Sequence, residues 1–76
     1  MWLKVNTAAL SVLREKQGLT QKRLAREVDV SASMISLIEN GKRNPSPKIG
    51  KRIANTLEVP MEAIFFFHDL DESQGK

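Results

Sequence analysis

The sequence predicts an all-α domain of five short helices. Three kinds of local signal support this: hydroxyl residues that can cap helices, glycines that can end them, and apolar residues spaced for one buried face. The expected helices cover residues 7 to about 17, 21 to 28, 32 to 39 or 40, and 47 to 57, with a last short one from residue 59 or 60. A length of 76 residues suits one domain with a single small core.

The first expected helix can begin at Asn6 or Thr7, either of which can cap it. Gly18 follows it and can adopt the left-handed conformation that commonly ends a helix. The preceding residues, Met1–Val5, are apolar and partly β-prone, and they are too few to form a domain. We expect this helix to pack across the two helices that follow it.

Two helices in the middle of the chain have entry signals of one design. Thr20 can cap helix 21–28, and Ser31 can cap helix 32–39. Each cap has an apolar residue before it and another four positions into the helix, which is the pattern of a hydrophobic staple. Asp29 occupies the turn between them, where the residue must tolerate positive φ. Two short helices at a fixed angle, the second beginning with small polar residues, are typical of a helix-turn-helix that reads DNA.

The fourth helix is expected to start with Ser46 as its cap and Pro47 in its first turn. Gly50 lies inside this helix at a cost of about 1 kcal/mol relative to alanine, so we expect a close helix contact there. The last short helix is expected to begin at Val59-Pro60. Its apolar face would consist of Met61, Ile64 and Phe65.

Charge is distributed unevenly along the chain. Residues 1–57 contain 11 of the 12 Lys and Arg residues and four acidic residues, a balance of +7, whereas residues 58–76 contain five acidic residues and one lysine, a balance of −4. A basic body with an acidic end is expected when one face meets a polyanion, although a solvated helix surface would also explain such charges.

The composition also limits the cellular compartment and the kinds of functional site that we expect. The chain has no cysteine, no apolar run long enough to span a bilayer and no secretory signal, so we expect a cytoplasmic protein. Residues 1–68 should form the single domain and residues 69–76 a polar tail. We find no nucleophile–base pair, phosphate loop or catalytic carboxylate pair, so we expect neither an enzyme nor a cofactor. His68 is the lone histidine, and no metal site is expected around it.

The middle of the chain resembles a known family. The segment is LREKQGLTQKRLAREVDVSASMISLIENGKRNPSP, and the match continues through KRIANTLEVPMEAIF, roughly residues 10–65. It is similar to the Cro/CI-type (XRE) helix-turn-helix proteins, the lambda-repressor-like DNA-binding domains. The resemblance implies a compact five-helix domain, usually a homodimer, that regulates transcription in bacteria and phages.

The resemblance also implies roles for individual residues. Gln21 corresponds to a glutamine that contacts a phosphate and braces the recognition helix, and Arg14 and Glu39 correspond to a buried ion pair. The expected phosphate contacts are Gln21, Ser31, Asn40, Lys42, Arg43 and Asn44. The expected base-reading residues are Ala32, Ser33, Ser36 and Leu37.

The chain departs from the family pattern where bases are read. Ala32 and Leu37 occupy positions at which many relatives carry long polar side chains that make bidentate base contacts. Here only serine hydroxyls remain, together with methyl groups that could touch a thymine methyl. Asp29 stands where glycine is commonest, and Gly50 replaces a usually larger residue.

The aromatic run Phe65–Phe67 is a second functional signal. Three aromatic residues on a short terminal helix cannot all be buried in one small domain, and exposed apolar patches often mark interfaces. We therefore expect a homodimer, with Phe65, Phe66, Phe67 and Trp2 as interface candidates. The alternative is a short terminal β-ribbon in which Trp2–Val5 pairs with Phe66–His68, and the two hypotheses can coexist.

Together these observations predict a dimeric repressor that occupies promoter DNA, with helix 32–39 in the major groove. Two-fold symmetry would place the two recognition helices about 34 Å apart, so the partner should be double-stranded DNA with an inverted repeat. No cofactor, membrane or small-molecule ligand is implied. One alternative is an antitoxin-like or other protein-interaction module that also autoregulates by binding DNA. Another is a DNA-binding subunit whose specificity comes from a partner or from DNA shape.

Overall fold

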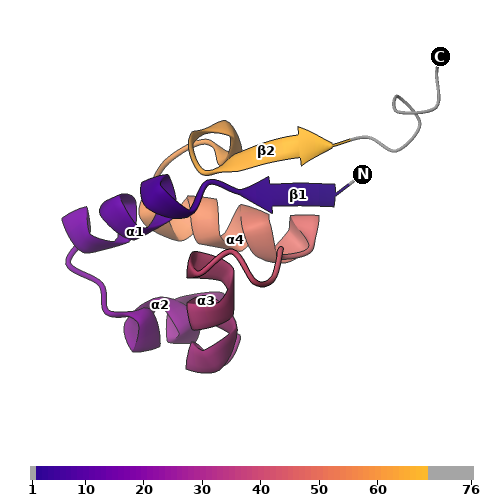
Figure 1. The fold of residues 1–76 in the computed structure, drawn as a ribbon. Coiled ribbons are helices and arrows are strands. Elements are labelled where there is room, and N and C mark those ends of the chain that lie inside the picture. Colours follow the sequence, from indigo (N-terminus) through magenta and orange to yellow (C-terminus); the bar gives the residue numbers. More distant parts are fainter. Residues whose placement is uncertain (1, 69–76) are drawn as a thin grey trace, which may run out of the picture.

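Four α-helices and a two-stranded ribbon make up residues 2–68, the part of the chain that this computed structural model describes (Figure 1). The expected polar tail, residues 69–76, lies outside the described residues. In chain order the elements are β1 (Trp2–Val5), α1 (Thr7–Lys16), α2 (Gln21–Val28), α3 (Ala32–Glu39), α4 (Pro47–Leu57), a 3-10 turn η1 (Met61–Ala63) and β2 (Phe65–His68).

Each α-helix begins at a capped residue. The caps are Asn6, Thr20, Ser31 and Ser46, and the side-chain oxygen of each accepts a hydrogen bond from the backbone N–H three residues further on. The first helix therefore uses Asn6 rather than Thr7. These bonds satisfy N–H groups that have no partner inside the helix, which explains why the helices start where the sequence predicts.

The residues that end two of the helices have positive φ although they are not glycine. Asp29 follows α2 with φ 64°, and Glu58 follows α4 with φ 62°. Asp29 was expected in this conformation, and Glu58 was not. Side chains other than glycine, asparagine and aspartate pay about 1–2 kcal/mol in this region, so Glu58 is a strained end for α4.

The core lies between the helix pair α2–α3 and the flanking elements α1, α4 and the ribbon. Its fully buried side chains come from every layer: Leu3, Leu10, Leu24, Val28, Ile35, Ile38, Ile53, Leu57 and Ile64. In α3 the buried residues Ile38 and Glu39 lie three and four positions after Ile35, which puts all three on one side, so the opposite side of that helix is left to solvent. The apolar pattern of the sequence therefore determines which face of α3 is available to a partner.

The ribbon is antiparallel and lies on the opposite side of α4 from the α2–α3 pair (Figure 1). Its register pairs Val5 with Phe65 and Leu3 with Phe67. Leu3 packs so closely on α4 that a Cβ added to Gly50 would lie 2.5 Å from its Cδ1 atom. The close contact expected at Gly50 is therefore made by the ribbon and not by another helix.

The prediction of a fifth helix is wrong. After Pro60 the chain makes a single 3-10 turn, η1, and then becomes the extended strand β2. The backbone oxygen of Ile64 accepts a hydrogen bond of 2.8 Å from the N–H of Asn6, which begins the pairing with the N-terminal segment. Pairing with β1 gives the backbone N–H and C=O groups of these residues hydrogen-bond partners, so it is an alternative to forming a helix. The alternative of a terminal β-ribbon is confirmed, with Phe65 added to its second strand. The fold is therefore mostly helical with a small sheet, and not all-α.

Candidate nucleic-acid interface

The solvent side of α3 carries small and apolar side chains. Ala32, Ser33 and Leu37 are exposed, whereas Ser36 is half-buried. Ile35 and Ile38 occupy the opposite side and are fully buried. This surface has no long side chain at its N-terminal end, so the helix backbone can approach another surface closely.

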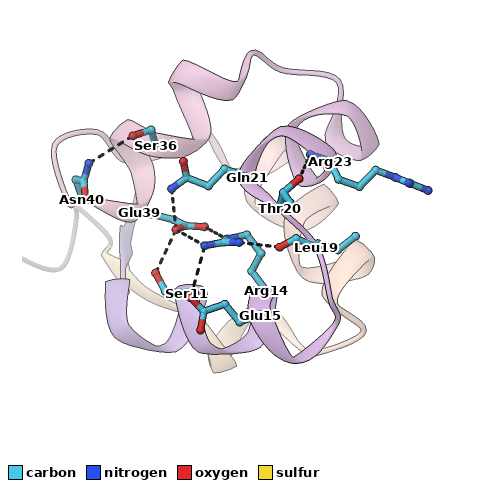
Figure 2. Close-up of polar contacts among 10 residues, drawn as sticks. All are labelled: Ser11, Arg14, Glu15, Leu19, Thr20, Gln21, Arg23, Ser36, Glu39 and Asn40. Atoms are coloured by element: carbon cyan, nitrogen blue, oxygen red, sulfur yellow. Dashed lines mark hydrogen bonds and ion pairs between the residues drawn. The ribbon is translucent and has the colours of Figure 1, made fainter.

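Several of the expected contact residues already have partners within the protein. The hydroxyl oxygen of Ser31 accepts a hydrogen bond of 3.0 Å from the N–H of Met34 and so caps α3. The side-chain nitrogen of Asn40 lies 3.5 Å from the hydroxyl oxygen of Ser36, a long hydrogen bond one turn apart on the same side of the helix (Figure 2). A serine hydroxyl that accepts one bond can still donate another, so neither serine is excluded from a ligand contact.

Glu39 holds the C-terminal end of α3 in place through a group of donors (Figure 2). Its Oε1 atom accepts from the Ser11 hydroxyl at 3.2 Å and from Gln21 Nε2 at 3.1 Å. Arg14 donates from Nε to Oε2 at 2.5 Å and from Nη2 to Oε1 at 3.3 Å. The carboxylate thus joins α3 to α1 and to the first residue of α2.

This ion pair is well shielded from water. The side chains of Arg14 and Glu39 are 13% and 4% exposed. Arg14 also donates from Nη1 to the backbone oxygen of Leu19 at 2.6 Å, which includes the α1–α2 connection in the same network. Within residues 3–67 every buried side-chain nitrogen and oxygen has a hydrogen-bond partner. A buried charge pair needs such complete bonding to offset its desolvation cost.

The structure places Gln21 where it can support α3, because its amide nitrogen donates to Glu39. A primary amide has two N–H groups, and only one is needed for this bond. Gln21 is half-buried and begins α2, so part of its side chain remains accessible at the start of that helix. The bracing and the anion contact are therefore compatible.

Exposed cations follow α3 directly. Lys42 and Arg43 are exposed in the α3–α4 loop, and neither has an acidic partner among the described residues. By contrast, Arg23 pairs with Glu27 at 3.2 Å on α2. Unpaired positive charges beside the exposed side of α3 create a surface that suits phosphate groups.

Two structural roles in this region have no sequence signal. The Oδ1 atom of Asn44 accepts a hydrogen bond of 3.3 Å from the N–H of Val5, so the loop that carries Lys42 and Arg43 is attached to β1. Ser11 is the other missed residue, as a donor to Glu39. Both bonds join residues that are far apart in the chain, 39 and 28 positions respectively, so no local pattern could indicate them.

The interface candidates at the ribbon divide into two kinds. Phe65 is only 3% exposed and is a core residue, which removes it from the free surface. Phe66 and Phe67 are 55% and 43% exposed. The backbone of Trp2 pairs with that of His68 at the open end of the ribbon. Only Phe66 and Phe67 therefore give the ribbon a described apolar surface.

Other kinds of site find no support in residues 2–68. Among the side chains that the structure describes, those of residues 3–67, no group of three or more His, Cys, Asp or Glu could hold a metal ion. None of the helices in this range combines the length and the apolar character that crossing a membrane requires. The described residues that stand out are thus the exposed side of α3, its support at Glu39 and the adjacent cations.

Comparisons with known proteins agree with this geometry. The Helix-turn-helix family model matches residues 10–64. An uncharacterized HTH-type transcriptional regulator of Archaeoglobus fulgidus is 40% identical over 63 residues, which are 83% of this chain and 89% of that protein. The HTH-type transcriptional repressor RghR of Bacillus subtilis is 45% identical over 58 residues, but these are 75% of this chain and only 43% of the repressor. The solved structure of the restriction-modification controller protein C.AhdI of Aeromonas hydrophila superposes with a TM-score of 0.71 at 28% identity, covering 75% of this chain and 86% of that one.

Proposed function

Because the chain belongs to the helix-turn-helix family, we propose that it regulates transcription by binding duplex DNA with α3 in the major groove, most simply as a repressor that occupies a promoter. The observation that carries this proposal is the exposed side of α3, supported from behind by the Glu39 network and flanked by unpaired cations. A regulator of this kind acts on the chromosome, so we place it in the cytoplasm. Residues 1–68 would be the DNA-binding domain.

Base reading would be limited in this proposal. The Ser33 and Ser36 hydroxyls can hydrogen-bond to base edges, and Ala32 and Leu37 can contact thymine methyl groups. None of these makes the bidentate contact that discriminates a base pair by about 1–3 kcal/mol. Part of the specificity would then come from DNA shape and deformability.

Phosphate contacts would supply most of the affinity. Lys42 and Arg43 would neutralise phosphates beside the groove, and Gln21 would donate its free amide N–H at the start of α2. Asn40 and Asn44 lie in the same region and would add neutral donors. Such contacts set the position of the protein on the duplex, and they make binding depend strongly on salt.

The salt dependence provides the test. We expect Lys42→Ala and Arg43→Ala each to reduce the slope of log affinity against log salt concentration by about 0.9, because each variant releases one counterion fewer. Fluorescence anisotropy with a labelled duplex at several salt concentrations measures this slope. Lys4→Ala is the matched control, since Lys4 is exposed on the ribbon, on the other side of α4. Unchanged slopes for both loop variants would remove these residues from the phosphate contacts.

We further propose a homodimer that binds an inverted repeat. Phe66 and Phe67 provide exposed apolar surface on the ribbon, whose open end lies beside the start of α4 (Figure 1). In this dimer the two-fold axis would pass next to the open end of the ribbon. It would run in the direction from the ribbon side of α4 to the α2–α3 side, so both α3 helices would lie on one face of the dimer. Two helices on one face can enter successive major grooves about 34 Å apart.

A further inference from the structure

A groove with a volume of about 530 Å³ lies where the α2–α3 turn, the α3–α4 loop and the start of α4 meet. Its apolar lining comes from Val30, Met34 and Ile49, all of them only half-buried, and from two prolines, Pro45 in the α3–α4 loop and Pro47 at the start of α4. The volume falls within the range of about 300–1,000 Å³ that is typical of small-molecule sites. The protein thus leaves apolar side chains of three segments partly uncovered in one concave place.

The polar lining of this groove is Arg43, Asn44 and Ser46; the Ser46 oxygen already accepts from the N–H of Ile49, and Arg43 and Asn44 offer hydrogen-bond donors. Arg43 lines it and has no acidic partner among the described residues. Asn44 lines it too, and because its oxygen already accepts from Val5, its amide nitrogen is the part left for a ligand. Helix α4, which is 11 residues long, begins at the groove, and the positive end of its dipole favours an anion there. The polar groups therefore select acceptor oxygens that carry negative charge.

From this combination we propose that the groove binds a small amphipathic anion. Its carboxylate or phosphate head group would bind Arg43 and Asn44, and its hydrocarbon or aromatic body would cover Val30, Met34 and Ile49. Arg43 makes bidentate, charge-assisted bonds to both kinds of head group. An uncharged apolar molecule would make no ionic bond to the Arg43 guanidinium. A small inorganic anion would leave the apolar side chains of the groove exposed to water.

This site would regulate the function proposed above and rests on it. Arg43 cannot bind a phosphate of DNA and the head group of the ligand with the same donors, so the two partners compete. The groove also includes Met34, which belongs to α3, so an occupied groove contacts the recognition helix itself. By linkage, the ligand lowers the affinity for DNA by the same factor by which DNA lowers the affinity for the ligand.

Binding is tested on the whole chain by recording backbone amide NMR shifts during a titration with octanoate. We expect saturable shifts at Val30, Met34 and Ile49, with acetate and 1-octanol at least tenfold weaker, since each supplies only half of the ligand. Octyl phosphate in a parallel titration distinguishes the two head groups. Equal affinity for octanoate and 1-octanol, or no saturable shift at these residues, would overturn the proposal. So would shifts there that follow protein concentration without ligand, since they would make the groove a contact between copies.

A variant pair tests the head group. Arg43→Gln should weaken octanoate binding by about tenfold or more, which is the range expected for the loss of a hydrogen bond to a charged group. Lys22→Gln removes an exposed lysine from α2, outside the groove, and should leave octanoate binding unchanged. Equal effects of the two variants would indicate general charge attraction and overturn the assignment of the head group to Arg43.

Competition is measured separately with a labelled duplex. Saturating octanoate should lower the DNA affinity of the parent chain at least tenfold and leave that of Arg43→Gln unchanged. Because the NMR titration contains no DNA, a failure of the proposed DNA binding would leave the groove intact as a finding. Octanoate binding with unaltered DNA affinity in the parent chain would reject the regulatory role.

Discussion

Glu39 is a charged residue in an apolar setting, with a side chain that is 4% exposed, and its environment explains why it is tolerated. Arg14 supplies the balancing charge, and Ser11 and Gln21 supply further donors. Because these donors come from α1 and α2, the carboxylate fixes α3 relative to both. The orientation of α3, the helix proposed to contact DNA, therefore depends on bonds made at its buried end.

Replacement of Glu39 by glutamine should lower the free energy of unfolding by about 3–5 kcal/mol, because Arg14 would keep its charge in a site with little water. The midpoint of urea denaturation measures this, provided that the slope of the transition is unchanged. Glu15→Gln is the matched control. Its carboxylate lies 3.9 Å from the same arginine but is 71% exposed, so its loss should cost less than about 1 kcal/mol. Similar costs for the two variants would mean that burial contributes nothing to the Arg14–Glu39 pair.

At this scale the sequence identifies residues better than it identifies their bonds. Arg14, Gln21 and Glu39 can be assigned from the resemblance to a family, because their spacing belongs to a known pattern. The structural bonds of Ser11 and Asn44 could not be assigned, because their partners are distant in the chain and many serines and asparagines look alike. Hydrogen bonds of single side chains depend on tertiary placement, which the local sequence does not contain.

At the scale of elements, the close packing of the ribbon on α4 depends on Gly50, which has no side chain. Gly50 allows Leu3 to approach α4, and an added Cβ would meet Leu3 at 2.5 Å and Phe65 at 3.3 Å. Both neighbours are buried and belong to the two strands of the ribbon. The helix tolerates a poor helix former here because the alternative would move the ribbon.

Gly50→Ala tests this account, because its effect on the free energy of unfolding should differ between the parent chain and a Leu3→Ala background. In the parent chain the clash should lower the free energy of unfolding by about 1–2 kcal/mol, since overpacking costs more than alanine gains in helix propensity. In a Leu3→Ala background the 2.5 Å clash is absent and the tightest remaining contact is that with Phe65 at 3.3 Å, so the same substitution should be less destabilising there and can raise stability by up to about 1 kcal/mol. Urea denaturation of the four variants gives both values. A stabilising effect in the parent chain would show that the ribbon yields without cost.

The elements themselves were predictable to unequal degrees. The caps Thr20, Ser31 and Ser46 act within three residues, so the starts of α2, α3 and α4 follow from local sequence. The segment after Pro60 was mistaken for a helix, because its apolar residues fit helical spacing as well as an extended strand. Its pairing with β1 joins the two ends of the described chain, and a local pattern cannot decide between that pairing and a helix.

At the scale of the whole molecule, α4 separates two surfaces. The α2–α3 side carries the proposed DNA contacts, and the ribbon side carries the exposed aromatic residues (Figure 1). A change on one side should therefore affect its own function first. Mutations of this kind at separate sites are expected to be nearly additive in stability.

The double variant Phe66→Lys, Phe67→Lys should separate association from DNA contact. Both side chains are exposed, so the charges cost little in the folded monomer but would be desolvated in a dimer interface. We expect a folded monomer by sedimentation and circular dichroism, and we expect the parent chain to sediment as a dimer. Selection of bound sequences from random duplex DNA should then recover an inverted repeat for the parent and a single half-site, bound more weakly, for the variant. A variant that remains dimeric would locate the interface elsewhere, and a single half-site for the parent would contradict the two-fold arrangement.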